Sequence, residues 1–311
     1  MPFYACFIGD SLTDAQDMFD LAPADYRAHR IKQAIDGQYG TDITARRFGV
    51  AGQTSGQILA RARIALVVRG IPDLVSLYAG ANDPLRSSHV RGNAATTMSI
   101  PLAAQPGFDA GHGMAVGSWV IIDGASRKIG AIADGAIMLA SPLAAAPADG
   151  TPVAIDTRTN LVEIVRIYQA MRGPHVARVV LHEMHMKNWS IGGDGIESED
   201  PVYAGIRVQQ RLARDDIATM PGVELAYVDN LAAMRALIDA GVETLHSDCW
   251  ATSTNNQHLN CIRQRGGLKP GGQDVLAANE IAAIQARPGW ISAIAPPADL
   301  QRCAARETIA Y

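Results

Sequence analysis

The sequence predicts an α/β fold, a parallel sheet covered by helices, with a small β-rich subdomain inserted into it. Short apolar runs alternate with longer amphipathic segments along most of the chain, which is typical of parallel strands joined by helices. The 311 residues, 48% of them hydrophobic, suffice for one domain with a buried core and an insertion. Between residues 84 and 155 the helical period is missing and tight-turn signals recur.

The α/β part opens with the apolar run 3–8, which reads as a strand directly at the start of the sequence. Gly37 is expected to end the first helix, and Pro270-Gly271-Gly272 to precede the last one. Strands are expected at 3–8, 43–50, 74–79, 178–184 and 224–228, and helices at 25–35, 53–68, 160–171, 202–220, 231–240 and 273–286.

The insertion is recognised by Asp-Gly pairs at 123–124, 134–135 and 149–150. Asp and Gly tolerate the positive φ angles that tight hairpin turns require. Strands at 118–123, 127–133, 136–140 and 152–155 have the spacing of a small barrel or sandwich. We therefore expect two units, residues 1–83 with 156–311 and residues 84–155.

Charge and hydropathy argue against two classes of partner. The net charge is −4 with scattered Lys and Arg, so we expect no nucleic-acid binding. No apolar run reaches the roughly 18 to 20 residues that a membrane span needs, and the first residues lack the pattern of a signal peptide. The expected location is the cytoplasm by default, with non-classical export or a phage particle as alternatives, and the sequence indicates no oligomeric state.

Four residues with possible roles in catalysis lie at the ends of predicted strands or shortly before the last predicted helix. Ser11 follows the first strand, Gly52 the second and Asn82 the third, and His258 lies in a polar loop. The carboxyl edge of a parallel sheet is where ligands bind. A serine with a neutral imidazole as base suits nucleophilic catalysis, and an Asn amide can donate to an oxyanion.

Together these features resemble the four sequence blocks of the GDSL/SGNH hydrolases. Residues 9–12 read Gly-Asp-Ser-Leu, Gly52 follows the second strand, residues 80–83 read Gly-Ala-Asn-Asp, and His258 precedes the last helix. The resemblance covers the chain apart from the insertion. It implies a flavodoxin-like three-layer α/β/α sandwich and a Ser11 nucleophile. It also implies an oxyanion hole formed by the N–H groups of Ser11 and Gly52 and the side chain of Asn82.

One position departs from the family pattern. The last block of the family reads Asp-x-x-His, but the residue three before His258 is Asn255. An amide can hold the imidazole tautomer without supplying negative charge. Three alternatives stay open: Asn255 orients His258, Asp248 does so from the same loop, or a backbone carbonyl does. A disulfide between Cys249 and Cys261, which bracket His258, would favour Asp248.

The sequence indicates neither a metal site nor a cofactor. Residues 182–185 read His-Glu-Met-His, but strand alternation sends His182 and His185 to opposite faces, so a pocket-lining role is expected rather than zinc. Nucleotide-binding glycine motifs do not follow any expected strand. Cys6 is expected to be a buried core residue.

We therefore expect a carboxylic ester hydrolase that acts through an acyl-serine intermediate without a cofactor. Family members with insertions often act on carbohydrates, which favours a carbohydrate O-acetylesterase with a small-molecule or glycan ester as substrate. A lipid or aryl esterase is the first alternative. A carbohydrate-binding protein with this fold and little or no turnover is the second, since loss of the acid would slow the reaction.

Overall fold

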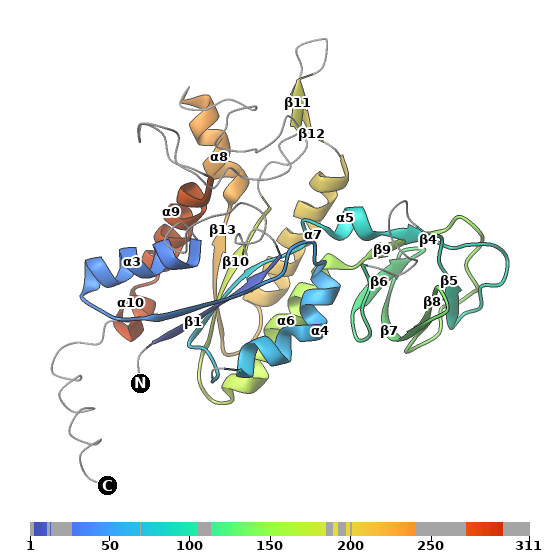
Figure 1. Cartoon of the computed structure of the whole chain (residues 1–311), viewed down its shortest axis with the longest axis horizontal. Helices are drawn as coiled ribbons and strands as arrows, with labels where there is room; N and C mark the ends of the chain where they lie inside the picture. The colour runs from blue at the N-terminus through green and yellow to red at the C-terminus, as the bar shows by residue number, and fades with distance from the viewer. Residues whose placement is uncertain are drawn as a thin grey trace, which may run out of the picture.

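The computed structural model describes residues 3–10, 13, 27–68, 70–104, 113–184, 189–191, 197–199, 201–240 and 272–294. Figure 1 shows an α/β domain with a separate β-rich lobe projecting from one side. Within these residues, none of the helices has the length and apolar character required to cross a membrane.

A five-stranded parallel sheet forms the centre of the α/β domain. Its order is β13-β10-β3-β1-β2, with β1 inside the sheet and buried along its whole length. The strands are β1 (Tyr4–Gly9), β2 (Thr44–Gly49), β3 (Leu74–Tyr78), β10 (Ala177–His182) and β13 (Val223–Val228). Gly9 pairs with Gly49 of β2 and with Tyr78 of β3, so three strands end level at the carboxyl edge of the sheet.

Helices cover both faces of the sheet, as Figure 1 shows. One layer contains α4 (Ser55–Val67), α6 (Thr157–Arg172) and α7 (Pro201–Ala218), and the other contains α3 (Arg27–Tyr39), α9 (Gly272–Gln285) and α10 (Pro288–Ile294). The short helix α8 (Asn230–Asp239) packs on α9. Alternate residues of β1 enter the two cores, Cys6 and Ile8 the first and Ala5 and Phe7 the second. The expected three-layer sandwich is confirmed.

The end of α3 differs from the expectation. The helix continues past Gly37 to Tyr39, and the residue in the left-handed conformation is Gly40, with φ of 65°. Its N–H donates to the carbonyl of Asp36 at 2.8 Å. A Cβ at Gly37 would meet no atom within 4 Å, so packing does not require a glycine at this position of the helix.

The insertion folds as a six-stranded antiparallel sheet of order β4-β9-β6-β7-β8-β5. Its strands are β4 (Ser88–His89), β5 (Ser99–Pro101), β6 (Trp119–Ile122), β7 (Ala125–Ala133), β8 (Ala136–Leu139) and β9 (Pro152–Ile155). A bridge between Val90 and Leu102 joins the two ends of this sheet and closes it into a small barrel. The interior is a separate apolar core that includes Val120, Ile129 and Ile137.

Two of the three expected Asp-Gly turns form hairpins. Asp123 and Asp134 both have φ of 50°, and the glycines that follow them also have positive φ, so each pair makes a tight hairpin turn. At 149–150 only Gly150 has a positive φ, and the strands on either side, β8 and β9, do not pair. Strands β4 and β5 were not expected, because they have only two and three residues. The inserted β-rich subdomain is confirmed, while the division at residues 83 and 155 stays a prediction.

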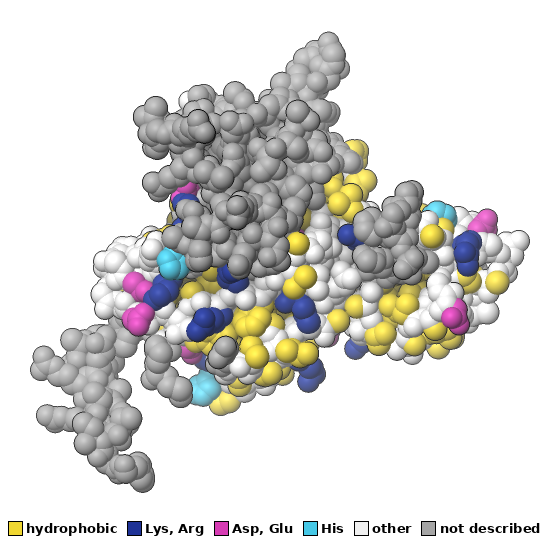
Figure 2. Space-filling model, in the orientation of Figure 1, with side chains coloured by type: hydrophobic (Ala, Val, Ile, Leu, Met, Phe, Trp, Pro, Cys, Tyr) yellow, Lys and Arg dark blue, Asp and Glu magenta, His cyan; other side chains and the backbone are white. Residues whose placement is uncertain are grey.

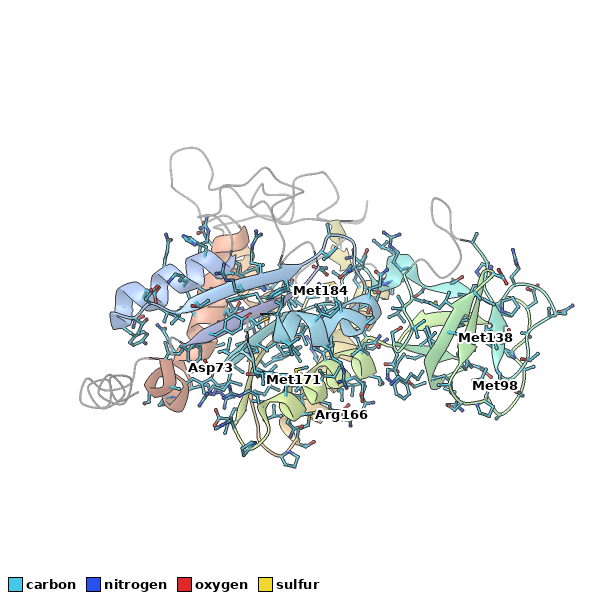
Figure 3. The ribbon with its side chains drawn as sticks, turned by 60° about the horizontal axis from the view of Figure 1, so that its bottom comes forward. Asp73, Met98, Met138, Arg166, Met171 and Met184 are labelled. Carbon is cyan, nitrogen blue, oxygen red and sulfur yellow. The ribbon has the colours of Figure 1, made fainter. Side chains whose placement is uncertain are left out.

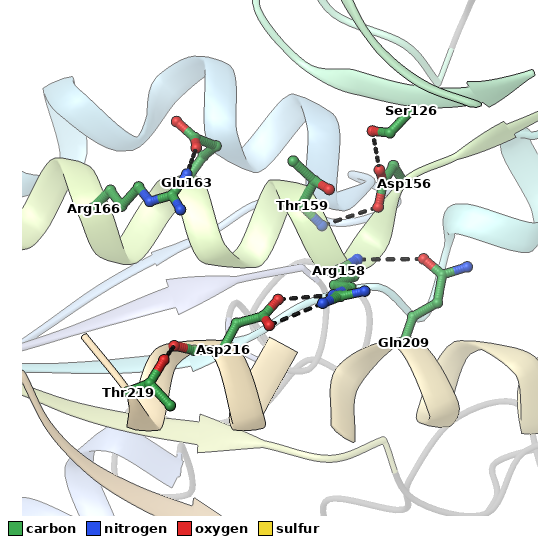
Figure 4. Close-up of polar contacts among 9 residues, drawn as sticks. All are labelled: Ser126, Asp156, Arg158, Thr159, Glu163, Arg166, Gln209, Asp216 and Thr219. Atoms are coloured by element: carbon green, nitrogen blue, oxygen red, sulfur yellow. Dashed lines mark hydrogen bonds and ion pairs between the residues drawn. The ribbon is translucent and has the colours of Figure 1, made fainter. Parts of the chain in front are cut away.

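Polar contacts join the barrel to the helical layer (Figure 4). Asp156 caps α6 by accepting from the N–H of Thr159 at 2.9 Å, and it also accepts from the hydroxyl of Ser126 in β7. Arg158 forms two hydrogen bonds to Asp216 of α7, at 2.7 and 2.9 Å. The helix that leaves the barrel is therefore held both to the barrel and to α7.

Two groups of apolar side chains are exposed away from the carboxyl edge of the sheet. Figure 2 shows hydrophobic side chains gathered over α4, where Ile64 is 69% exposed and Val67 51%. On the barrel, Met138 of β8 and Met98, the residue before β5, lie at its surface (Figure 3). A short antiparallel pair, β11 (Trp189–Ile191) and β12 (Glu197–Glu199), precedes α7 in the chain.

Replacing Asp156 should destabilise the protein. We expect Asp156→Ala to lower the free energy of unfolding by about 1 to 2 kcal/mol, because α6 loses its cap. Urea unfolding measures the change. Asp215→Ala is the control, since Asp215 is 61% exposed and should shift stability by less than about 0.5 kcal/mol. Equal effects of the two substitutions would contradict the capping role.

Candidate functional site

The carboxyl edge of the parallel sheet brings together three of the sequence blocks. Asp10 directly follows β1 and is fully buried, Gly52 lies in the turn after β2, and Asn82 lies in the turn after β3. Ser11 is next to Asp10 in the sequence but lies outside the described residues. The structure thus confirms that Gly52 and Asn82 share the edge at which β1 ends.

Gly9 is required at the end of β1 by close packing. A Cβ atom there would lie 2.2 Å from the Thr13 hydroxyl oxygen and 2.3 Å from the carbonyl oxygen of Tyr78. The N–H of Thr13 donates to the carbonyl of Asp10 at 3.0 Å. Gly9 and Thr13 are therefore closely packed at the end of β3.

The Gly52 turn has a backbone conformation suited to glycine. Its φ is +74°, and the position where a Cβ would be added lies 3.6 Å from a guanidinium nitrogen of Arg86. Two residues later Thr54 caps α4, in a reciprocal box with Gln57. The hydroxyl of Thr54 also donates to the carbonyl of Gly113 at 2.5 Å, which ties this turn to the insertion.

A hydrogen-bond network connects the three blocks. Arg61 of α4 donates from Nη2 to the carbonyl of Gly9 at 2.8 Å and from Nε to the side chain of Gln53 at 2.5 Å. The backbone carbonyl of Gln53 accepts from the Nδ2 of Asn82 at 3.0 Å. The N–H of Val50 also donates to the carbonyl of Gly9 at 3.2 Å. Arg61 and Gln53 carry this geometry but were not singled out from the sequence, because their partners lie on other segments.

The network orients the amide of Asn82. An Asn amide carries two N–H hydrogens, and the contact with Gln53 uses one of them. Among the described residues the second hydrogen has no acceptor, and Asn82 is only partly buried, so this hydrogen can be donated to a bound group. A fixed amide donor at this edge can stabilise negative charge that develops on an oxygen.

Asp83, the residue after Asn82, is a fully buried carboxylate. It accepts from the N–H and the hydroxyl of Ser55 at 2.7 and 2.5 Å, and from the hydroxyl of Thr157 at 2.6 Å. Burial raises the pKa of Asp83 to about 6; hydrogen bonds from Ser55 and Thr157 act in the opposite direction, and the charge of Asp10 adds to the increase.

A second polar cluster, centred on His182, is buried on the α3 and α9 side of the sheet. The Nε2 of His182 lies 3.0 Å from Glu280 and 3.3 Å from the hydroxyl of Ser76, and Nδ1 lies 3.2 Å from the amide of Asn230. Arg27 approaches Glu280 at 3.5 Å. His182 is fully buried, so its expected pocket-lining role is wrong.

This cluster does not have the geometry of a catalytic triad. Ser76 and Glu280 approach the same imidazole nitrogen, whereas a triad places the serine and the acid at opposite nitrogens. Ser76 is itself fully buried. Burial lowers the pKa of His182, with a further decrease from the charge of Arg27, and these effects outweigh Glu280, so the imidazole is neutral. We assign the cluster a structural role.

The remaining predicted site residues lie outside the described residues. They are Ser11, His258, Asn255, Asp248, Cys249 and Cys261, and their roles stay predictions. Cys6 is a free and fully buried core residue, as expected, and burial raises the pKa of its thiol to about 12. Among the residues that the structure describes, no group of three or more His, Cys, Asp or Glu side chains could hold a metal ion.

Two surface cavities lie away from Gly52 and Asn82. One, of about 410 Å³, is beside Trp290 and the start of β13. The other, of about 450 Å³, lies under the β6–β7 hairpin between α6 and α7, where Arg158 is paired with Asp216 (Figure 4). The contacts at the carboxyl edge, rather than these cavities, define the candidate site.

Solved structures of esterases share the fold of this chain. One is a variant of Axe2, an acetyl xylan esterase from Geobacillus stearothermophilus, with 15% identity, a TM-score of 0.50 and coverage of 90% of this chain and 94% of that chain. A second Axe2 mutant, described as an acetyl-xylooligosaccharide esterase, has 14% identity, a TM-score of 0.50 and coverage of 90% and 93%. At these identities the likeness shows the fold.

A catalytic mutant of Axe2 gives a similar result, with 13% identity, a TM-score of 0.50 and coverage of 91% of this chain and 95% of that chain. No family model matches the sequence, and no curated protein matches it. The fold likeness therefore extends over most of both chains.

The neutral buried His182 should make stability depend on pH. Its folded pKa lies below the ordinary value of 6.5, so its contribution is complete above pH 6.5 and is lost as the pH falls towards the folded pKa. We expect His182→Gln to reduce the loss of unfolding free energy between pH 7.5 and 5.5, measured in urea. His175→Gln, at an exposed position, should keep the slope of the parent protein. An unchanged slope in His182→Gln would contradict the assignment.

Proposed function

We propose that this protein is a serine ester hydrolase with Ser11 as nucleophile and an oxyanion hole at the carboxyl edge of the sheet. The observation that carries the proposal is the network in which Arg61 binds Gly9 and Gln53, and Gln53 binds Asn82. It holds the turn that leads to Ser11 beside the two expected oxyanion donors, as acyl transfer requires.

In the proposed reaction the Ser11 oxygen attacks the acyl carbon of an ester while His258 takes the hydroxyl proton. The N–H groups of Ser11 and Gly52 and the amide of Asn82 stabilise the oxyanion that forms. The bond from the acyl carbon to the alcohol oxygen then breaks, and His258 protonates the departing alcohol. A water molecule attacks the acyl-serine in the second half, which returns the proton to Ser11 and releases the acid.

For the substrate we favour an acetyl ester of a carbohydrate. The Axe2 structures carry the names of acetyl xylan and acetyl-xylooligosaccharide esterases, and the barrel follows Asn82 directly in the chain. This support is analogy of fold, which many activities can share. A lipid or aryl ester is the alternative substrate, and a carbohydrate-binding protein without turnover is the alternative class.

Removal of the nucleophile or of the oxyanion donor should lower turnover. We expect Ser11→Ala to reduce the release of nitrophenol from p-nitrophenyl acetate by at least ~1000-fold, and Asn82→Ala to reduce kcat by ~100-fold. Asn93→Ala, an exposed barrel substitution, is the matched control and should retain activity. Equal turnover by Ser11→Ala and the parent protein would sink the enzyme proposal. The same proteins assayed on acetylated xylan and on a long-chain ester distinguish the substrate classes.

The orienting residue of His258 can be located by substitution. We expect Asn255→Ala to lower kcat by ~10-fold or more, and Asn255→Asp to raise it, because a carboxylate stabilises the imidazolium that forms. Initial rates on p-nitrophenyl acetate measure both. A loss in Asp248→Ala alone would assign the role to Asp248, and no change in either alanine variant would assign it to a backbone carbonyl.

A further inference from the structure

Asp83 links the two segments that carry the expected oxyanion donors. It follows Asn82 in the chain, and its carboxylate binds Ser55, three residues after Gly52. The N–H of Asp83 donates to the carbonyl of Gly80 at 3.1 Å, which closes the turn that contains Asn82. One carboxylate therefore holds the start of α4 to the turn after β3.

The same carboxylate also holds the point where the chain leaves the insertion. Thr157, the first residue of α6, donates its hydroxyl to Asp83 at 2.6 Å. The hydroxyl of Ser55 accepts from the amide of Asn160 at 3.2 Å, and Asn160 accepts from the N–H of Trp119 in β6 at 2.9 Å. A continuous set of hydrogen bonds thus runs from Asp83 through α4 and α6 to the barrel.

Helix capping does not explain these contacts. The start of α4 is already capped by Thr54, and the start of α6 by Asp156. A fully buried carboxylate is costly unless several donors surround it, and the hydrogen bonds to Asp83 have the short lengths of charge-assisted bonds. Its three donors come from two helices, α4 and α6, so the three hydrogen bonds form together only when both helices are correctly placed.

We infer that Asp83 is a positioning residue that sets the relative placement of the Gly52 turn and Asn82, and that it couples this oxyanion hole to the inserted barrel through Ser55, Thr157 and Asn160. The inference rests on the proposed function, because it assumes that Gly52 and Asn82 stabilise an oxyanion. A displacement of about 1 Å between such donors can cost roughly 100-fold in rate. Asp83 acts through Asn82 and Gly52 and does not contact the substrate.

The inference predicts non-additive kinetics. Asp83→Asn keeps the shape of the side chain but places an amide against donors, so we expect kcat on p-nitrophenyl acetate to fall by ~10- to 100-fold with KM changed by less than ~3-fold. In an Asn82→Ala background the same substitution should lower kcat by less than ~3-fold, because one of the donors that it positions is already gone. Thr157→Val, a milder change that removes one donor to Asp83, should lower kcat by ~3- to 10-fold.

Glu280→Gln is the matched control, since Glu280 is also a fully buried carboxylate but contacts His182 and Arg27 on the α3 and α9 side of the sheet. It should lower the melting temperature and leave kcat unchanged. The inference is overturned if Asp83→Asn and Thr157→Val lower only the melting temperature. It is also overturned if Asp83→Asn lowers kcat by the same factor with and without Asn82.

The Ser11→Ala variant distinguishes failure of the proposed function from failure of the positioning role of Asp83. If Ser11→Ala abolishes turnover while Asp83→Asn and Thr157→Val retain the parent kcat, the positioning role alone fails. If Ser11→Ala retains turnover, the proposed function fails and the positioning role falls with it. Should Asp83→Asn not fold, Thr157→Val measured with and without Asn82 provides the same comparison.

Discussion

The hydrogen bonds from Ser55 and Thr157 to the buried carboxylate of Asp83 are the constraint on which the arrangement of this molecule depends. They join the start of α4, the start of α6 and the turn after β3, which are far apart in sequence. A buried carboxylate without donors would be strongly unfavourable, so these three segments are held together as a unit. The raised pKa of Asp83 reflects how completely this unit excludes water.

Hydrogen bonds join the inserted barrel to the carboxyl edge of the parallel sheet. The chain enters the barrel through α5 (Asp83–Arg86) and leaves it into α6 at Thr157. Asp83 is the first residue of α5, and Thr157 donates a hydrogen bond to it, so the two connections are joined. Thr54 and Asn160 add contacts to Gly113 and Trp119. The barrel has an apolar core of its own, separate from the two cores of the α/β domain.

The opposite side of the sheet holds the buried cluster of Arg27, Glu280 and the neutral His182. Burial by itself raises the pKa of Glu280, but His182 and Arg27 outweigh burial and lower it, so this carboxylate is charged inside the core. Arg27 lies 5.3 Å from the ring centroid of Tyr78, and His182 stacks on the same ring at 5.1 Å. The cluster fastens α3 and α9 to β3 and β10.

The sequence by itself determined the parallel sheet, its helices, two Asp-Gly hairpins and the shared strand edge of Gly52 and Asn82, because these follow from periodicity, turn chemistry and parallel strand order. The tertiary structure decided what those patterns do not encode. Closure of the barrel depends on the short strands β4 and β5, and α3 ends before Gly40, which adopts the left-handed conformation, rather than at Gly37. Apart from the bond between Arg61 and Gln53, the contacts of Arg61, Gln53 and Asp83 join residues 28 to 74 positions apart. Local sequence patterns do not predict such pairs, because the two partners lie on separate segments that come together only when the chain folds.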